Sequence, residues 1–493
     1  MRSFNSSKVV KRGPGYNRRV EGDAKLLRLS DMLWGRRGPF AQRLVRALVS
    51  VALRLFFRRI ETSRAELVPD EGPVVFVLNH PNGLIDPALV FAALPRHISF
   101  LAKSTLFDLP VIGALLRAVE ALPLYRRADA GSDLAQNRLT FEACRRLLRT
   151  GRAIALFPEG VSHNSTKLLP VKTGAARIAL GAASVGGDEE GVNEEARPLG
   201  LRIVPVGLYY TSKSSFRSEA LLRFGEPLEV SPARLDEDGE PHRAEVQELS
   251  ARIEAALRGV TLNVENEGQL EVVRRAERLF SSVYEGLNVR LPLAARFDFL
   301  RRFASERLGR LAGAGAGLEG RLRRHEEELR RIGIAPENLS LSRHSAWYVF
   351  RHFLLRVGLL LLLSPLAIVG AALHYPAYLC CALLARLFPR HGPDEIAPTV
   401  KILAAVVLMP LTWLVVAGLS IYVWGWRVAL LALPAAIVCG YAAMRTLEAL
   451  VDMRGWFKAV FLLIGRRRLF LRLLVERQAL GAEVAREGRR EGV

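Results

Sequence analysis

Residues 74–87, VVFVLNHPNGLIDP, run from a short apolar segment through a turn into the start of a helix. The β-branched segment Val74–Leu78 is typical of a buried strand. In the helix that follows, Asp86 is expected at the N-cap and Pro87 at the first helical position. His80 therefore comes directly after a strand, at the edge of the sheet where ligands bind in α/β proteins.

Strand and helix signals alternate outward from this stretch, from Pro73 to about Val230. Further strands are predicted at 97–103, 152–157 and 203–210, and helices at 86–94, 109–119, 133–149 and 173–184. Such alternation implies an α/β domain in which helices flank a mostly parallel sheet. We assign this domain to residues 61–231.

The spacing of His80 and Asp86 lets the carboxylate fold back to the imidazole across the turn at Gly83. In such a dyad the imidazole takes a proton from an alcohol, and the carboxylate fixes the tautomer of the ring. The structural alternative is that Asp86 only caps the helix and His80 is an ordinary loop residue.

A second polar segment, Phe157-Pro-Glu-Gly160, also follows a strand, and Ser162 lies just beyond it. Gly160 permits close backbone approach, so amides near Gly160 or Asn82 are candidates to hold an oxyanion. Glu159 is a candidate to order nearby arginines or to bind acceptor hydroxyls. A plain strand-to-helix turn is the alternative.

Basic residues follow two further segments: Lys103 ends the second strand, and Arg126 and Arg127 follow Leu122-Pro-Leu124. The forked donors of arginine match phosphate geometry, which makes these residues candidate phosphate ligands. Any one of them alone is usually a solvated surface charge. His163 and Lys172 are weaker candidates of the same kind.

The chain of 493 residues carries a formal net charge of +21, and its mean hydropathy is +0.16. We expect a basic flexible arm over 1–39 and a helical connector over 232–345. Residues 40–60 are expected to form an amphipathic helix at the membrane interface, with Arg43, Arg46 and Arg54 on one face and Leu44, Leu48 and Leu55 on the other. The alternative is a surface helix whose apolar side packs on the core.

Apolar runs mark residues 346–446 as a transmembrane region, with spans at 353–373, 402–424 and 428–444, and a run at 377–388 that is too short to cross alone. We expect two hairpins, the first one re-entrant around Pro365 and Pro376. Basic residues flank both ends, so the catalytic domain and a basic tail over 447–493 are expected on the cytoplasmic face. Such a chain is predicted to bind membrane lipids and no nucleic acid.

The three polar segments, in this order and ahead of Val204-Pro-Val206, resemble the glycerolipid acyltransferase superfamily over about residues 73–225. Five residues separate His80 from Asp86, one more than in the common pattern. With Asn82 and the segment 102–104, this spacing is similar to the branch of glycerol-3-phosphate/dihydroxyacetone-phosphate acyltransferases. Glu120 stands where the phosphate block of the family usually has glycine.

The resemblance implies that residues 61–231 are a catalytic domain that transfers a fatty-acyl group directly, with His80 as the base and Asp86 orienting it. Arg126, helped by Lys103 or Ser162, would hold the acceptor phosphate, and Asn82, Glu159 and Gly160 would line the substrate site. We expect no metal and no cofactor, with acyl-CoA or acyl carrier protein as co-substrate and a phosphorylated glycerol-type molecule as acceptor.

Two alternatives stay open at this point. One lies in the same class: an acyltransferase for 1-acyl-sn-glycerol-3-phosphate (lysophosphatidic acid) or another lysophospholipid. The other is a non-catalytic, membrane-anchored lipid-binding protein.

Overall fold

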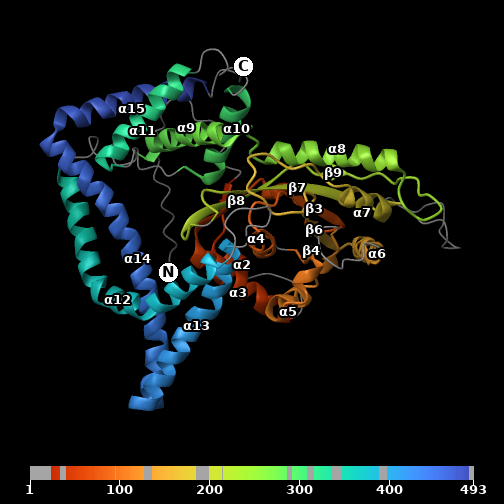
Figure 1. The fold of residues 1–493 in the computed structure, drawn as a ribbon, viewed down its shortest axis with the longest axis horizontal. Coiled ribbons are helices and arrows are strands. Elements are labelled where there is room, and N and C mark those ends of the chain that lie inside the picture. Colours follow the sequence, from red (N-terminus) through yellow and green to blue (C-terminus); the bar gives the residue numbers. More distant parts are fainter. Residues whose placement is uncertain are drawn as a thin grey trace, which may run out of the picture.

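The computed structural model describes residues 24–33, 40–94, 96–126, 136–184, 199–213, 215–285, 291–307, 316–334, 346–387 and 397–487. Most of the predicted basic arm and Arg127 lie outside these ranges. Figure 1 shows an α/β unit, with the helices α9 to α11 and α15 beyond one end of it and the long helices α12 to α14 at its side.

The described residues contain a nine-stranded sheet in the order β1-β2-β8-β7-β3-β6-β4-β5, with β9 beside β7. Its strands are β1 (Ala24–Leu26), β2 (Phe57–Ser63), β3 (Val74–Leu78), β4 (Ile98–Lys103), β5 (Leu122–Leu124), β6 (Ala153–Leu156), β7 (Arg202–Tyr210), β8 (Ser218–Phe224) and β9 (Leu228–Glu229). The run from β7 through β3, β6 and β4 to β5 is parallel, whereas β8 is antiparallel to β7. The predicted α/β class with a mostly parallel sheet is confirmed.

The sheet begins earlier in the chain than the predicted boundary at residue 61. Helix α3 (Phe40–Phe56) ends at Phe56, and β2 starts at the next residue, inside the stretch predicted as helix. Strand β2 pairs in parallel with β8, and Phe57 and Ile60 are fully buried. Pairing and burial therefore override the helical periodicity that continues to Arg59 in the sequence.

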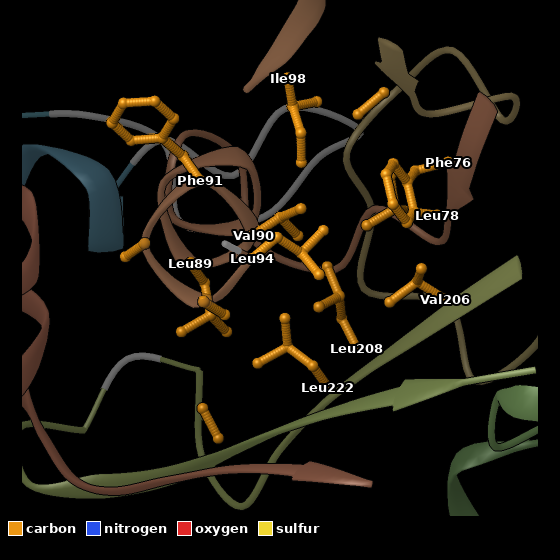
Figure 2. Packing of buried hydrophobic residues seen from close by; sticks show 14 of the residues in the cluster. Phe76, Leu78, Leu89, Val90, Phe91, Leu94, Ile98, Val206, Leu208 and Leu222 are labelled. Carbon is orange, nitrogen blue, oxygen red and sulfur yellow. The ribbon is translucent and has the colours of Figure 1, made fainter. Parts of the chain in front are cut away.

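Every residue of β3 is buried, and successive side chains of a strand point to opposite faces of the sheet. Both faces of the sheet are therefore covered, each by a layer of helices. Phe76 and Leu78 pack on α4 (Ile85–Ala93) in a core that also contains Leu89 and Val90 (Figure 2). The other face packs on α6 (Gln136–Arg149), α7 (Gly174–Ala183) and α8 (Arg243–Val260). Because its buried side chains hold α4 against β3, the first turn of this helix has a defined position beside the loop that follows the strand.

Helix α3 carries apolar side chains on two faces, one packed on the core and one exposed. Val45, Val49, Leu53 and Phe56 pack on the sheet core, while Leu44, Leu48, Val51 and Leu55 are exposed. Arg46 is buried and donates to the carbonyl of Leu94, and its guanidinium lies 4.5 Å from the ring centroid of Phe91. An apolar side of α3 thus packs on the core, as in the structural alternative, but it is not the predicted leucine face, which is exposed.

The predicted helical connector contains α8, α9 (Glu267–Glu285), α10 (Leu293–Arg307) and α11 (Ala316–Ile332). Helix α8 belongs with the sheet, while α9 and α11 pack with α15 (Arg467–Glu487). Helix α10 connects the two groups, because its Phe297 packs on Leu221 of β8 and Tyr209 of β7.

Three helices in the described residues are long and apolar enough to cross a membrane, judged by length and composition: α12 (Ala346–Arg386), α13 (Ala397–Trp424) and α14 (Trp426–Gly465). Pro365 and Pro376 lie inside the single helix α12, so the predicted short segment at 377–388 is the continuation of that helix. The two predicted hairpins are therefore replaced by one long helix and one hairpin at Gly425. Helix α14 also continues past the predicted boundary at 446.

Candidate active site

The carboxyl ends of four neighbouring parallel strands bring the polar segments to one edge of the sheet. In spatial order these strands are β3, β6, β4 and β5. His80 follows β3, the segment Phe157–Gly160 follows β6, Lys103 ends β4, and Arg126 follows β5. This is the edge at which ligands bind in α/β proteins.

His80 and Asp86 form the predicted dyad, with 2.9 Å between His80 Nδ1 and Asp86 Oδ2. The Asp86 side chain is fully buried, and that of His80 is 12% exposed. The imidazole stacks on Phe157 with 4.0 Å between ring centroids, which fixes its plane. The N-cap expectation for Asp86 is wrong, because Leu84 is the N-cap and Asp86 lies in the first turn of α4. Its carboxylate reaches back across Gly83, whose φ is +37°.

Asp86 accepts two further hydrogen bonds, which fix its orientation. The Asn82 amide donates to Oδ2 at 2.7 Å, and the Tyr210 hydroxyl donates to Oδ1 at 2.6 Å. Burial, followed by the Asp86 carboxylate, raises the pKa of Tyr210 well above its ordinary value, so this hydroxyl keeps its proton. Sequence motifs did not indicate Tyr210, although the predicted strand at 203–210 ended on it.

These bonds determine the tautomer of His80. An ionised carboxylate only accepts hydrogen bonds, so Nδ1 of His80 must donate its proton to Asp86. The lone pair then lies on Nε2, and no group among the described residues hydrogen-bonds to that nitrogen. His80 is therefore arranged to take a proton from a ligand at the edge of the sheet.

Glu159 holds the loops on both sides of the dyad together. Oε1 accepts the backbone N–H of His80 at 2.9 Å, and Oε2 accepts the N–H of Leu169 at 2.7 Å. His163 Nε2 lies 2.5 Å from the same Oε2, while His163 Nδ1 accepts the N–H of Ser165. Both carboxylate oxygens are thus used within the protein, and a direct contact of Glu159 with a substrate stays a prediction.

Asn82, Ser162 and Gly160 also make contacts within the site. Asn82 Nδ2 donates to the carbonyl of Lys213 at 3.2 Å, and the amide of Gly83 donates to Ser162 Oγ at 2.9 Å. The amides of Asn82 and Gly160 already donate to Asp86 and to the Phe157 carbonyl, so neither is available for an oxyanion in this structure. Gly160 has φ +76°, and a Cβ there would lie 2.3 Å from Lys172 Nζ.

Lys103 and Arg126 lie on the same edge, at the ends of β4 and β5. Lys103 is in register with Leu124, two residues before Arg126. Strand β5 is three strands from β3, about 14 Å at the usual strand separation. Arg126 Nε is buried and has no hydrogen-bond acceptor among the described residues. Arg126 thus has a donor to offer to an anion.

Glu120, at the position where the family usually has glycine, lies away from this edge. It precedes β5, so it lies at the opposite, amino edge of the sheet, and it forms an ion pair with Arg152. Its φ of +55° is in the left-handed region, which glycine adopts without the Cβ penalty. The glycine preference is thus explained by the backbone of this turn.

The bond from Tyr210 predicts an effect of Tyr210→Phe on activity. We expect kcat/KM to fall about tenfold, since a hydrogen bond to a charged group is worth about 1.5 to 3 kcal/mol. Without this donor the Asp86 carboxylate interacts more strongly with the imidazolium, so the acidic limb of the pH–rate profile moves to higher pH. Tyr209→Phe, the same change on the opposite face of β7, is the control. An unchanged pH profile would remove Tyr210 from the site.

In comparisons with known proteins, the part of the chain that contains the dyad matches an acyltransferase family and its members. Residues 59–209 match the family model described as Acyltransferase. Glycerol-3-phosphate O-acyltransferase 2 of Saccharomyces cerevisiae is 27% identical over 56% of this chain, and the match spans only 37% of the yeast protein. An uncharacterized acyltransferase of Schizosaccharomyces pombe is 23% identical over 89% of this chain and 79% of that protein.

A chloroplastic 1-acyl-sn-glycerol-3-phosphate acyltransferase of Brassica napus is 26% identical over 38% of this chain and 48% of its own length. The family match contains His80, Asp86, Glu159 and the basic residues of the sheet edge. Residues 59–209 are therefore similar to an acyltransferase domain, and glycerol-3-phosphate and 1-acyl-sn-glycerol-3-phosphate acyltransferases are among the relatives that match this part of the chain.

Proposed function

We propose that this protein transfers a fatty-acyl group from acyl-CoA or acyl carrier protein to a hydroxyl of glycerol 3-phosphate or dihydroxyacetone phosphate in phospholipid biosynthesis. One observation carries the proposal: Asp86 holds His80 through Nδ1, and Nε2 has no hydrogen-bond partner among the described residues, at the carboxyl edge of the sheet in the part of the chain that matches the Acyltransferase model. The similarity to a yeast glycerol-3-phosphate O-acyltransferase supports this choice of acceptor.

The transfer needs one base and no covalent acyl-enzyme. His80 Nε2 takes the proton of the acceptor hydroxyl while the hydroxyl oxygen attacks the thioester carbonyl carbon. When the tetrahedral intermediate collapses, the C–S bond breaks and the thiolate leaves with the proton from the imidazolium. The products are an ester and a free thiol. Asp86 keeps the ring oriented and stabilises its charged form during these steps.

Positive side chains at the sheet edge suit the charges of the reactants. Arg126 and Lys103 are proposed to hold the acceptor phosphate, since both lie at the carboxyl edge and Arg126 has an unused donor. Lys172, whose ammonium lies over Gly160, is proposed to stabilise the oxyanion in place of the occupied amides. All three proposals concern side chains rather than the backbone.

The membrane is the proposed destination of the acylated product. Helix α3 exposes large apolar side chains, among them Leu44, Leu48, Val51 and Leu55, and α13 lies next to this helix. A helix that turns apolar residues away from its own domain suits the bilayer interface. We propose that α3 rests on the membrane beside the apolar helices, with the acyltransferase domain on the cytoplasmic face.

The alternative acceptor, lysophosphatidic acid or another lysophospholipid, is favoured by the similarity to the Brassica napus enzyme. The alternative of a non-catalytic lipid-binding protein is disfavoured by the dyad, because a site that only binds lipid has no need for a bonded base. An assay of thiol release with glycerol 3-phosphate, dihydroxyacetone phosphate and lysophosphatidic acid side by side separates the three. We expect turnover with the first two, and no turnover with any acceptor would refute the proposal.

Arg126→Gln should then weaken binding of the acceptor. Loss of one arginine–phosphate contact is expected to raise KM for glycerol 3-phosphate about 10- to 100-fold, while KM for the thioester changes little. Arg146→Gln serves as the control, because Arg146 is exposed in the last turn of α6, which leads into the start of β6 at the opposite edge of the sheet. Equal changes in both KM values would contradict a phosphate-binding role for Arg126.

A further inference from the structure

A second basic site lies away from the dyad, in a cavity of about 590 Å³ between the sheet, the end of α8 and helix α10. Its volume falls within the range usual for small-molecule sites. The charged side chains that line it are Arg64, Arg223, Arg258, Arg301, Arg302 and Asp298. With five cations and one carboxylate among its described lining residues, the cavity is strongly basic.

The cavity lies on the face of the sheet opposite α4. Ala220, Leu222 and Phe224 of β8 pack in the core that contains α4, so Arg223 points to the other face. Leu221 on that face packs against α10. Figure 1 shows α8 and α4 on opposite sides of the sheet. The cavity is therefore separate from Asp86, which lies on α4.

Three of the five arginines form ion pairs within the protein. Arg64 pairs with Glu226, Arg258 with Glu254, and Arg223 with Asp298. Arg301 and Arg302 form no ion pair with any side chain that the structure describes. Their combined charge matches a phosphate monoester, which carries about −1.5 to −2 at neutral pH.

Two further observations favour an anion site. Nε of Arg223 is buried and has no hydrogen-bond acceptor among the described residues, while Nη1 forms the ion pair with Asp298 at 2.5 Å. Burial, followed by the charge of Arg223, lowers the pKa of Arg301. Buried donors without acceptors and like charges held together are both costly unless a ligand completes them.

From this geometry we infer that the cavity between α8 and α10 is a second anion site, which takes a phosphate group through Arg301, Arg302 and Arg223. The phosphate belongs either to a soluble phosphorylated molecule or to the headgroup of an anionic lipid. The proposal does not depend on the acyl transfer proposed above, because none of these arginines lies at the dyad.

The test measures binding of ³²P-labelled inorganic phosphate to the full-length protein in nonionic detergent, by equilibrium dialysis. Arg126→Gln is present in every sample, so that the proposed acceptor site does not contribute. We expect this protein to bind one phosphate, and addition of Arg301→Gln and Arg302→Gln to weaken binding at least about tenfold. Arg252→Gln, an exposed change on α8, should leave binding unchanged.

Two outcomes would overturn the inference: no phosphate bound by the Arg126→Gln protein, or equal binding after the two arginine changes. Thermal unfolding provides a second readout that does not require phosphate. Because Arg301 is repelled by Arg223, Arg301→Gln should keep or raise the Tm in phosphate-free buffer. A fall in Tm would mean that the cluster stabilises the fold and is not a ligand site.

The source of the phosphate is distinguished in nanodiscs. Phosphatidylglycerol discs should displace the labelled phosphate from the Arg126→Gln protein, relative to phosphatidylcholine discs, if the natural ligand is an anionic headgroup. Equal phosphate binding in both discs assigns the site to a soluble phosphorylated molecule. Both results are consistent with an anion site in this cavity. Acyl transfer, measured in parallel, tests the role of the dyad separately.

Discussion

His80→Ala should lower acyl transfer by about 10²- to 10⁴-fold, since this is the usual contribution of a positioned general base. The fold should remain, because Asp86 keeps its bonds from Asn82 and Tyr210, and the lost imidazole is replaced by solvent at a partly exposed position. Thiol release from an acyl thioester, with and without glycerol 3-phosphate, measures the effect.

The matched control is His242→Ala, because His242 is exposed before α8 and its side chain caps no helix N–H. Both variants should be recovered in the membrane fraction at the level of the unaltered protein. Acyl transfer at the original rate by the His80→Ala protein would exclude the imidazole as the base, whatever the acceptor.

Glu159→Ala is expected to have the largest effect on stability. The carboxylate accepts bonds from the His80 and Leu169 amides and contacts His163, and it is 2% exposed. Its removal leaves buried donors without an acceptor, which should lower the free energy of unfolding by about 3 kcal/mol or more. Activity should fall with stability, because the loop that carries His80 loses its attachment.

Thermal unfolding in detergent measures this loss, and Glu142→Ala on the exposed face of α6 is the control. Glu159→Gln should lose less stability than Glu159→Ala, since an amide oxygen can still accept one of the hydrogen bonds. A normal Tm combined with a raised KM for the acceptor would contradict the structural role and support direct binding of the acceptor by Glu159.

Local patterns were sufficient to predict the centre of the sheet but not its far edge. Val74–Leu78 matches β3 without error, because a strand buried on both faces is continuously apolar. Strands β2 and β8 were missed, since FRRIETS and SEALLRF mix charged with apolar residues as amphipathic helices do. Only their pairing with each other and with β7 makes them strands, and pairing is not visible in a single segment.

The same limit applies to the site. The His80–Asp86 pair follows from spacing across one turn, so the sequence alone predicted it. Tyr210 lies 124 residues from Asp86 and meets it only because β7 is next to β3. The occupied amides of Asn82 and Gly160 were likewise hidden, since a motif names residues but does not show which backbone donors are already bonded. Tyr210 and the occupied amides therefore become visible only from the contacts of the folded chain.

The helices at the membrane illustrate a different limit. Hydropathy found the apolar stretches, but proline suggested breaks at Pro365 and Pro376 that α12 does not have. Apolar helices tolerate proline when neighbouring helices supply contacts, and α12 packs on both α13 and α14. The number of helices thus depended on packing and not on the residues of one segment.

A double-mutant cycle of acyl transfer on His80 and Asp86 is the most direct measurement of the central proposal, that these side chains work as one base. If Asp86 acts only through His80, His80→Ala with Asp86→Asn should be as slow as His80→Ala alone, within about a factor of three. If the two losses multiply instead, the side chains act independently, and the hydrogen bond of 2.9 Å between them has no part in catalysis.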